Sequence, residues 1–171
     1  MSSTISAMSE ITLLVHNIRS THNVGAIFRT AEGFGVHKII LSGYTPYPKL
    51  EHDPRLPHIS EKITNQIHKT ALGAETMVPF EYYEQLDAWL SKNSNTTRLP
   101  LYGLEQAPDS IDLREFAPAP AFALLLGEEV QGIEPHYLSY CDKVIEIPMH
   151  GQKESFNVSV ATGIALYALS R

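Results

Sequence analysis

The residues best suited to chemistry lie in two polar loops, each of which follows an apolar run. Residues 127–132 follow the run 121–126, and residues 148–157 follow the run 143–147. Both loops combine carboxylates with glycines, and the second adds serine and asparagine. Because ligands in open α/β sheets bind at the carboxyl ends of the strands, the pattern predicts one shared site. An ordinary strand-to-helix connection contains the same residue types, so each loop alone leaves a purely structural role open.

A third polar group follows the first apolar run of the chain. Residues 11–15 predict a buried strand, and the apolar residues after Asn23 recur at helical spacing. Asn23 is the expected N-cap of this helix. Together with the apolar run 36–41, these segments predict a strand–helix–strand unit. Arg19, Asn23 and Arg29 are therefore expected near the carboxyl end of its first strand.

Strands and helices alternate through the rest of the chain. The Pro-rich segment 43–59 is expected to be a loop on the substrate side, since structureless loops above about 12–15 residues are usually functional or mobile. The alternation predicts an α/β fold in one domain, residues 1–171, with a mostly parallel sheet flanked by helices. Further helices are expected at 60–69 and 81–91, and a last helix is expected from Ser155 or Asn157 to Leu169. The helix at 81–91 is expected to bury the face that carries Tyr82, Leu86, Trp89 and Leu90. A short strand is expected to end at 80, and further strands are expected at 99–105, 121–126 and 143–147.

The last helix is apolar on more than one side. Between residues 158 and 169 only Ser159, Thr162 and Tyr167 carry polar side-chain groups, whereas a helix covered on one side has a polar opposite face. One face comprises Phe156, Val160, Ile164 and Tyr167, and another comprises Ala161, Ala165 and Ala168. This pattern predicts a homodimer whose interface includes this helix. A helix enclosed within one subunit is the alternative.

The charge of the chain is unevenly distributed. The net charge is -6, but residues 16–70 contain seven Lys or Arg against four Asp or Glu, a balance of +3, and residues 71–171 contain six against fourteen, a balance of -8. Six of the eight histidines also lie in the first of these segments. Nucleic-acid binding depends on cations that neutralise phosphates, so the first segment is compatible with an RNA partner. A chance grouping of solvated loops remains the alternative.

Several classes of protein fit the sequence poorly. A lone cysteine, Cys141, permits neither an intramolecular disulfide nor a thiolate zinc cluster, and no histidine pair has the spacing of ligands on one helix, so no metal is expected. No apolar run approaches the ~20 residues of a membrane span. Residues 1–10 lack a signal-peptide pattern, which predicts a cytoplasmic protein. The Walker, nucleophile-elbow and dinucleotide-binding motifs are absent as well.

Three stretches of the sequence resemble the motifs of the SpoU, or TrmH, family of RNA ribose methyltransferases within the SPOUT superfamily. They occur in the family's order and span nearly the whole chain. Phe156 stands where such proteins commonly have leucine. The three stretches are Asn17-Ile18-Arg19 with Asn23 to Ala31 and Phe34-Gly35, then Leu126 to Glu129 with Gly132-Ile133, and finally Ile147-Pro148-Met149 with Ser155 to Ala161.

The resemblance implies a fold and a cofactor that residue patterns alone do not. It implies a deep trefoil knot in the C-terminal part of the α/β fold, although general topology rules treat knots as rare exceptions. It also implies a homodimer and S-adenosylmethionine bound in a bent form, with the end of the strand 99–105 as a third wall of the pocket. The implied cofactor-binding residues are Gly103, Leu104, Glu105, Leu126, Gly127, Glu128, Gly132, Ile147, Pro148, Met149, Ser155, Phe156, Asn157 and Ser159.

The resemblance further assigns catalytic roles. Methyl transfer to a ribose hydroxyl needs a group that removes the proton or stabilises the developing alkoxide. Arg29 takes that place, and because a guanidinium is effectively always protonated, its expected role is to bind phosphate and stabilise negative charge. Asn23 is expected to orient Arg29 or the substrate. Glu129, Ser155 and Asn157 complete the polar wall, and Arg19, Asn23 and Arg29 are the expected RNA-binding residues.

Each of these residues also has a structural alternative, and the function has two. Asn23 and Asn157 are possible helix caps, Arg29 a possible surface ion pair, and Glu129 a possible solvated loop residue. The leading hypothesis is methyl transfer to a ribose 2'-hydroxyl of tRNA or rRNA. The alternatives are a SPOUT enzyme that methylates an RNA base and a protein that binds RNA or cofactor without turnover. The joint presence of the four residues disfavours the last.

Overall fold

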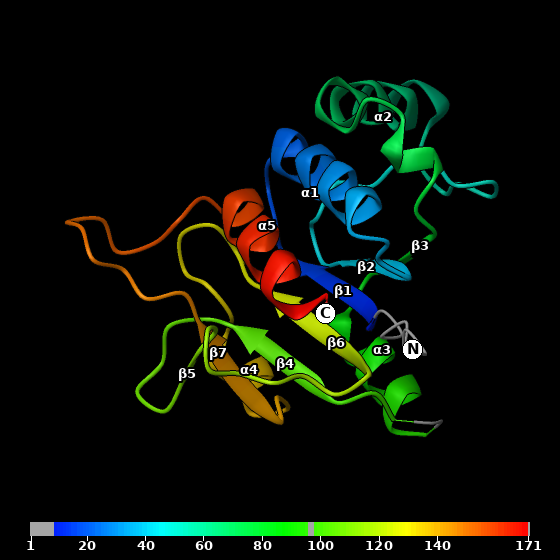
Figure 1. Ribbon diagram of the computed structural model, residues 1–171. Helices are drawn as coiled ribbons and strands as arrows, with labels where there is room; N and C mark the ends of the chain where they lie inside the picture. The colour runs from blue at the N-terminus through cyan, green and yellow to red at the C-terminus, as the bar shows by residue number, and fades with distance from the viewer. Residues whose placement is uncertain (1–8, 96–97, 171) are drawn as a thin grey trace, which may run out of the picture.

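One parallel sheet organises the molecule. The computed structural model describes residues 9–95 and 98–170, in which seven strands lie in the order β3-β2-β1-β6-β4-β7-β5 and every pairing is parallel (Figure 1). The strands are β1 Glu10–His16, β2 Lys38–Ser42, β3 Phe80–Tyr83, β4 Leu101–Leu104, β5 Ile111–Asp112, β6 Ala121–Leu126 and β7 Lys143–Glu146. The helices are α1 Thr21–Gly33, α2 Pro57–Ala71, the 3-10 turn η1 Ala74–Thr76, α3 Leu86–Ser94, α4 Pro135–Leu138 and α5 Val158–Leu169.

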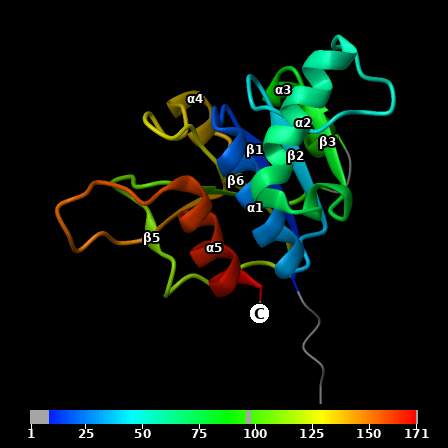
Figure 2. The ribbon, with the colours of Figure 1, turned by 90° about the horizontal axis from the view of Figure 1, so that it is seen from above.

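Helices cover both faces of the sheet. In Figures 1 and 2, α1, α2 and α5 lie side by side over one face, and α3 and α4 lie on the other. Successive strand residues point to opposite faces, so Leu13 and Val15 of β1 join the core under α1 and α5, while Leu14 joins the core under α3. Within the described residues, no helix combines the length and apolar character needed to cross a membrane.

The two central strands, β1 and β6, confirm the predictions made for residues 11–15 and 121–126. They pair in register from Glu10 opposite Ala121 to Val15 opposite Leu126. Strands buried on both faces are nearly continuous in apolar residues, and this is the pattern that made both strands predictable. Because β2 and β3 lie on one side of this pair and β4, β7 and β5 on the other, their carboxyl ends mark the crevice where ligands bind in such sheets.

Two local predictions were wrong. Residues 81–91 do not form one helix: Phe80–Tyr83 form strand β3, and α3 begins only at Leu86. Aromatic residues favour strands, and Tyr82 pairs with β2 as part of strand β3 and is not on a helix. Leu86, Trp89 and Leu90 are the buried residues of α3, as expected.

The N-cap of α1 also differs from the prediction. Ser20 is the cap, and its Oγ accepts a hydrogen bond from the Asn23 backbone N–H at 3.2 Å. Asn23 is therefore inside the first turn of α1, where its side chain is available for other contacts. In α5, by contrast, Asn157 is the N-cap, one of the two candidates named from the sequence.

The Pro-rich segment lacks helix and strand between residues 43 and 56, as predicted, whereas residues 57–59, which were expected in the loop, form the beginning of α2. Specific contacts hold the loop in place. The Arg55 guanidinium lies 3.6 Å from the centroid of the Tyr47 ring, which stacks on Tyr82 at 3.9 Å. Arg55 also donates to Asp53 Oδ1 at 2.8 Å and to the carbonyl oxygen of Tyr47 at 3.0 Å. The loop is thereby fixed against the β3 edge of the sheet.

We predict that Asp53→Asn destabilises the protein by about 1–3 kcal/mol, because the mostly buried Arg55 guanidinium loses its charged partner. The hydrogen bond from Arg55 holds the pKa of Asp53 well below its usual range. The contribution of Asp53 is therefore complete above the unfolded-state pKa of about 4 and is lost as the pH falls through the folded-state pKa.

Denaturant unfolding of Asp53→Asn and of the wild type, at pH 7 and at a series of pH values below the unfolded-state pKa of about 4, measures this effect. Asp109→Asn, which alters an exposed carboxylate before β5, is the matched control and should leave stability unchanged. Equal stability of Asp53→Asn and the wild type at pH 7 would contradict the role assigned to Asp53.

Candidate active site

A cavity of about 260 Å³ opens at the carboxyl ends of β4, β6 and β7. The structure thus brings together the two polar loops and the end of the strand predicted to form the third wall. The lining residues are Leu104, Glu105, Gln106, Leu126, Gly127, Glu128, Glu129, Val130, Gln131, Gly132, Ile147, Glu154, Ser155, Phe156, Val158 and Ala161.

The loop after β6 folds tightly upon itself. The backbone N–H of Gly132 donates to the Glu128 carbonyl oxygen at 2.9 Å, and the Glu128 N–H donates to the Gly132 carbonyl oxygen at 3.0 Å. A Cβ on Gly127 would lie 2.3 Å from the carbonyl carbon of Gly132. Gly132 itself has φ +71, and a Cβ there would meet Glu105 Oε2 at 2.0 Å. Both glycines are therefore required by the close approach of backbone to backbone and of backbone to carboxylate.

Glu105 holds this loop against the end of β4. Its Oε2 accepts a hydrogen bond from the Ile133 N–H at 2.8 Å, and its Oε1 accepts one from the Gln106 N–H at 2.9 Å. The side-chain amide of Gln106 in turn donates to the Glu154 carbonyl oxygen at 2.6 Å. These contacts connect the three loops around the cavity through one carboxylate and one amide.

Glu129 connects the same loop to the beginning of α1. Its carboxylate accepts hydrogen bonds from the backbone N–H groups of Arg19 and Ser20, at 3.1 and 3.2 Å, and from Asn23 Nδ2 at 3.2 Å. Burial raises the pKa of Glu129, but these donors outweigh burial and leave the pKa below its ordinary value. Glu129 is therefore an ionised partner of the α1 N-terminus, and the interpretation of it as a freely solvated loop residue was wrong.

Asn23 extends the network to the third motif. Asn157 Nδ2 donates to Asn23 Oδ1 at 3.2 Å, while Asn157 Oδ1 accepts from the Ser159 N–H at 2.9 Å and from Ser159 Oγ at 2.6 Å. Asn157 is thus both the cap of α5 and a member of the site. The side chains of Glu129, Asn23 and Asn157 form one hydrogen-bonded chain across three motifs that lie far apart in sequence.

The cavity is lined by both acidic and apolar side chains. Of the lining residues in the described part of the chain, four are glutamates and none is Lys or Arg. Apolar side chains form the remaining wall, among them Leu126, Ile147 and Phe156. A cavity with this lining favours a ligand that carries positive charge beside an apolar or aromatic body.

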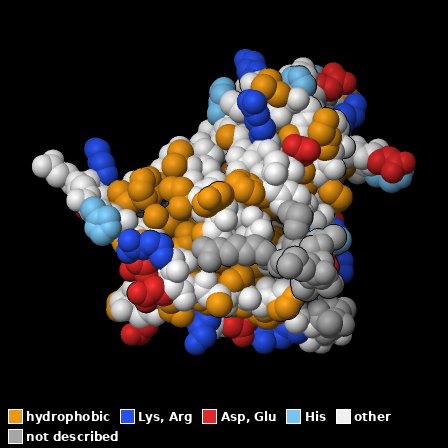
Figure 3. Space-filling view, in the orientation of Figure 1, with side chains coloured by type: hydrophobic (Ala, Val, Ile, Leu, Met, Phe, Trp, Pro, Cys, Tyr) orange, Lys and Arg blue, Asp and Glu red, His pale blue; other side chains and the backbone are white. Residues whose placement is uncertain are grey.

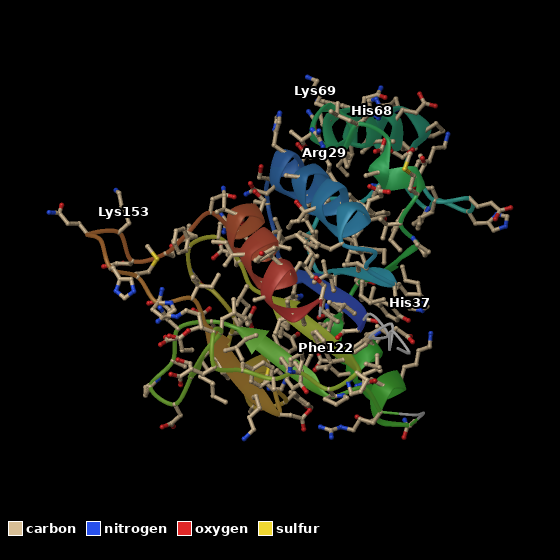
Figure 4. All side chains as sticks on the ribbon, in the orientation of Figure 1. Arg29, His37, His68, Lys69, Phe122 and Lys153 are labelled. Atoms are coloured by element: carbon tan, nitrogen blue, oxygen red, sulfur yellow. The ribbon has the colours of Figure 1, made fainter. Side chains whose placement is uncertain are left out.

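Some predicted site residues lie outside the cavity. Arg29 is exposed on α1, about 9 Å along the helix axis from Asn23 at 1.5 Å per residue, and Figure 4 shows it at the end of the molecule that carries His68 and Lys69. Arg19 lies at the rim, with its Nε 3.5 Å from Glu128 Oε1. The other predicted residues that do not line the cavity are Asn23, Gly103, Pro148, Met149, Asn157 and Ser159.

Six lining residues were not among the site residues named individually from the sequence, although four of them lie within the ranges 126–132 and 147–159 that were predicted to form the pocket. Gln106 and Glu154 belong to loops that meet only through tertiary folding, so neither has a local sequence signal. Val158 and Ala161 belong to the third motif, yet their turn toward the cavity depends on the docking of α5 against α1. The remaining two are Val130 and Gln131, in the loop after β6.

Comparison with known proteins identifies the family. The model of the SpoU rRNA Methylase family matches residues 10–167. The chain belongs to this family. The resemblance noted in the sequence is therefore confirmed. The second and third motifs line the cavity, and the first is joined to them by the hydrogen bonds of Asn23.

Curated SpoU relatives are similar over nearly the whole chain. The tRNA (guanosine(18)-2'-O)-methyltransferase of Aquifex aeolicus is 30% identical over 170 residues, which are 95% of this chain and 69% of that protein. The 23S rRNA (guanosine-2'-O-)-methyltransferase RlmB of Coxiella burnetii is 32% identical over 162 residues, 93% of this chain and 57% of that protein. The chain therefore spans little more than half the length of the RlmB relative.

Solved structures support the same fold. An AdoMet-bound rRNA methyltransferase from Sinorhizobium meliloti has a TM-score of 0.76 at 23% identity, covering 94% of this chain and 56% of that one. The A. aeolicus TrmH/SpoU tRNA modifying enzyme has a TM-score of 0.73 at 26% identity, covering 94% and 73%. These likenesses confirm the α/β fold with its mostly parallel sheet.

We predict that Gly127→Ala destabilises the protein by about 1–3 kcal/mol, the usual cost of forcing a methyl group into packed atoms. The clash is with backbone and not with a flexible side chain, so the loop after β6 must move. Thermal unfolding measures the loss of stability. Gly33→Ala is the control, because no atom lies within 4 Å of its added Cβ; it should retain wild-type stability. Equal stability of both variants would contradict the packing described for the loop.

Proposed function

We propose that this protein transfers a methyl group from S-adenosylmethionine to a ribose 2'-hydroxyl of tRNA or rRNA. The observation that carries the proposal is the acidic and apolar cavity lined by the second and third SpoU motifs, to which the first motif is joined through Glu129. The names of the relatives, which are guanosine 2'-O-methyltransferases of tRNA and 23S rRNA, support ribose as the acceptor over a base.

The chemistry of the cavity fits S-adenosylmethionine. The cofactor carries a sulfonium, an ammonium and one carboxylate, and it supplies an electrophilic methyl group when bound. Glu105, Glu128 and Glu129 provide negative charge for its cationic groups, while the glycine-containing loop offers backbone donors and acceptors for adenine. Leu126 and Ile147 provide an apolar surface for the ring.

The acceptor side of the reaction is assigned to polar groups around Asn23. With the cofactor bound, the 2'-oxygen would form a bond to the methyl carbon as the carbon–sulfur bond breaks, S-adenosylhomocysteine would leave, and the hydroxyl proton would pass to solvent water. A nearby cation stabilises the negative charge that develops on the oxygen. Arg29 provides this charge and binds an adjacent phosphate, with Arg19 as a second phosphate contact. Asn23 orients the substrate, and the side chains of Glu129, Ser155 and Asn157 form the polar wall.

The proposal extends to a homodimer. An apolar patch, made of Phe156 just before α5 and of Val160, Ile164 and Tyr167 on α5, is exposed to solvent, with Tyr167 exposed at 77%. Figure 3 shows hydrophobic side chains gathered over α5. Such a contiguous patch is typical of an interaction site. A second copy that covers it would approach α1, which packs against α5, and would bring Arg29 of one subunit toward the cavity of the other.

The proposal also includes the trefoil knot implied by the family resemblance. Residues 126–132 and 147–157 are the segments proposed to form it. Support comes from the adjacency of β6, β4 and β7, and from the return of the chain after β7 to α5, beside α1.

Methyl transfer to RNA from a strain that lacks the protein tests the function. The purified protein, radiolabelled S-adenosylmethionine and this RNA are incubated together, and the product is hydrolysed with alkali. A 2'-O-methyl group blocks cleavage of the adjacent phosphodiester, so label in alkali-resistant dinucleotides supports the proposal. Label in single nucleotides would indicate base methylation. If no RNA fraction of the cell becomes labelled, the enzymatic assignment is overturned.

We predict that Arg29→Ala abolishes methyl transfer while cofactor affinity stays within a few-fold of wild type, since Arg29 does not line the cavity of its own chain. Arg29→Lys should restore only part of the activity, because lysine lacks the planar bidentate fork. Single-turnover kinetics and calorimetry provide the two measurements. Arg98→Ala, which removes another exposed arginine, is the control. Wild-type turnover in Arg29→Ala would defeat the assigned role.

We predict that Ile164→Asp converts the protein to a monomer, because a charge placed in the apolar patch must lose its hydration when a second copy docks. Light scattering at micromolar concentration reports the mass. The control is Met77→Asp, an equivalent change at an exposed apolar residue outside α5. A monomeric wild-type protein with full activity would refute both the interface and the shared site.

A further inference from the structure

An exposed aromatic ring and an exposed guanidinium lie together beside the cavity. The Tyr44 residue follows β2 and is 52% exposed, and the Arg19 guanidinium carbon lies 5.6 Å from the centroid of its ring. The Arg19 side chain is 71% exposed. We call Arg19 and Tyr44 the rim pair. Neither side chain is needed for the core, so their juxtaposition requires another explanation.

The backbone beneath the rim pair is held in an unusual conformation. Asn17 has φ +57, which is uncommon for a residue other than glycine. Its Oδ1 accepts a hydrogen bond from the Tyr44 N–H at 3.2 Å. A Cβ on Gly43, which has φ +66, would lie 2.0 Å from Asn17 Oδ1. The position of Tyr44 is therefore determined by a close contact that only glycine at 43 permits.

Two further contacts fix the rim pair relative to the sheet. Thr45 Oγ1 accepts from the Ile18 N–H at 3.1 Å and donates to the Ser42 carbonyl oxygen at 2.7 Å. The contacts around Arg55 hold the rest of the Pro-rich segment in place. The ring of Tyr44 is thus presented by a preformed loop, which lowers the entropy lost when a ligand binds.

The rim pair borders the cavity on the side of α1. Arg19 Nε lies 3.5 Å from Glu128 Oε1, and its backbone N–H donates to Glu129. The Glu128 side chain is only 9% exposed, so the guanidinium, and not the carboxylate, faces solvent. An ion pair with so exposed a cation contributes little to stability, and Arg19 is free to exchange it for a phosphate.

We propose that the rim pair holds an unpaired nucleotide of the RNA next to the one whose ribose is methylated. The Tyr44 ring stacks on the base, and the Arg19 guanidinium binds the adjoining phosphate. Proteins recognise single-stranded RNA through such combinations of aromatic stacking and cationic contacts. This inference rests on the proposed function. It adds Tyr44 as a binding residue and single-stranded RNA as the substrate class at this surface.

Fluorescence of a short oligoadenylate that contains one 2-aminopurine tests the stacking contact. The probe is titrated with the full-length protein in the presence of S-adenosylhomocysteine, which prevents turnover. Tyr44→Leu should weaken binding about five-fold or more, the lower end of the contribution of one stacked base, and should remove the quenching that stacking causes. Tyr44→Phe keeps the ring and should bind as the wild type does. Tyr140→Leu, at another exposed tyrosine on the α4 side, is the matched control.

The salt dependence of binding tests the phosphate contact independently. Arg19→Gln should reduce the steepness of the plot of log affinity against log salt concentration by the amount that one phosphate contact contributes. Tyr44→Leu should leave this slope unchanged. This measurement remains decisive if Tyr44→Leu is poorly folded.

The outcomes separate this inference from the proposed function. Unaltered oligoadenylate affinity and quenching in Tyr44→Leu, together with an unaltered slope in Arg19→Gln, would overturn the rim-pair assignment while methyl transfer by the wild type persists. Failure of the wild type to bind S-adenosylmethionine would instead refute the proposed function, regardless of its affinity for the oligoadenylate.

Discussion

The ionised carboxylate of Glu129 at the N-terminus of α1 is the interaction on which the site depends. It accepts hydrogen bonds from the backbone N–H groups of Arg19 and Ser20, which lead into α1, and its negative charge interacts favourably with the N-terminus of the helix. Glu129 does so from a loop more than a hundred residues away in the sequence. The Asn23 side chain then joins Glu129 to Asn157. A single charge thus fixes the loop after β6, the first turn of α1 and the cap of α5 relative to one another.

Negative and positive charges of the site come from different segments of the chain. A net charge of -6 argues against a polyanionic partner for the chain as a whole, yet the acidic residues of the cavity all come from the segment 71–171. Arg19 and Arg29 come from the segment 16–70, whose balance is +3. Strand β1, which leads into the segment 16–70, pairs with β6 of the segment 71–171, and Arg19 and Asn23 contact Glu129 at the end of this pair. The proposed cationic cofactor and the proposed RNA substrate would therefore meet adjacent surfaces of opposite charge.

The parts of the fold that were predictable are those with strong local patterns. The buried runs that form β1 and β6, the proline at the start of α4 and the cap at Asn157 all have such signals. The segment Phe80–Tyr83 has no such local signal, because its aromatic residues suit either a buried helix face or an edge strand. Its strand conformation depends on the tertiary pairing with β2.

The composition of the site was predictable only through the family motifs. The motif residues identify which loops meet, but they do not reveal the contacts that hold the loops. Glu105 supports Gly132 and Ile133 through a pairing that no local spacing indicates. Tyr44 lies outside the motifs quoted, and its position depends on the left-handed conformation of Asn17. Such features arise from tertiary contact and have no periodic signature in the sequence.

Hydrogen–deuterium exchange with and without S-adenosylmethionine tests the central claim most directly, namely that the loops held by Glu105 and Glu129 form the cofactor site. Binding should slow amide exchange in the three lining segments, residues 104–106, 126–132 and 154–158, while exchange in α2 stays constant. Unchanged exchange in these segments at saturating cofactor, or protection confined to α2, would contradict the account.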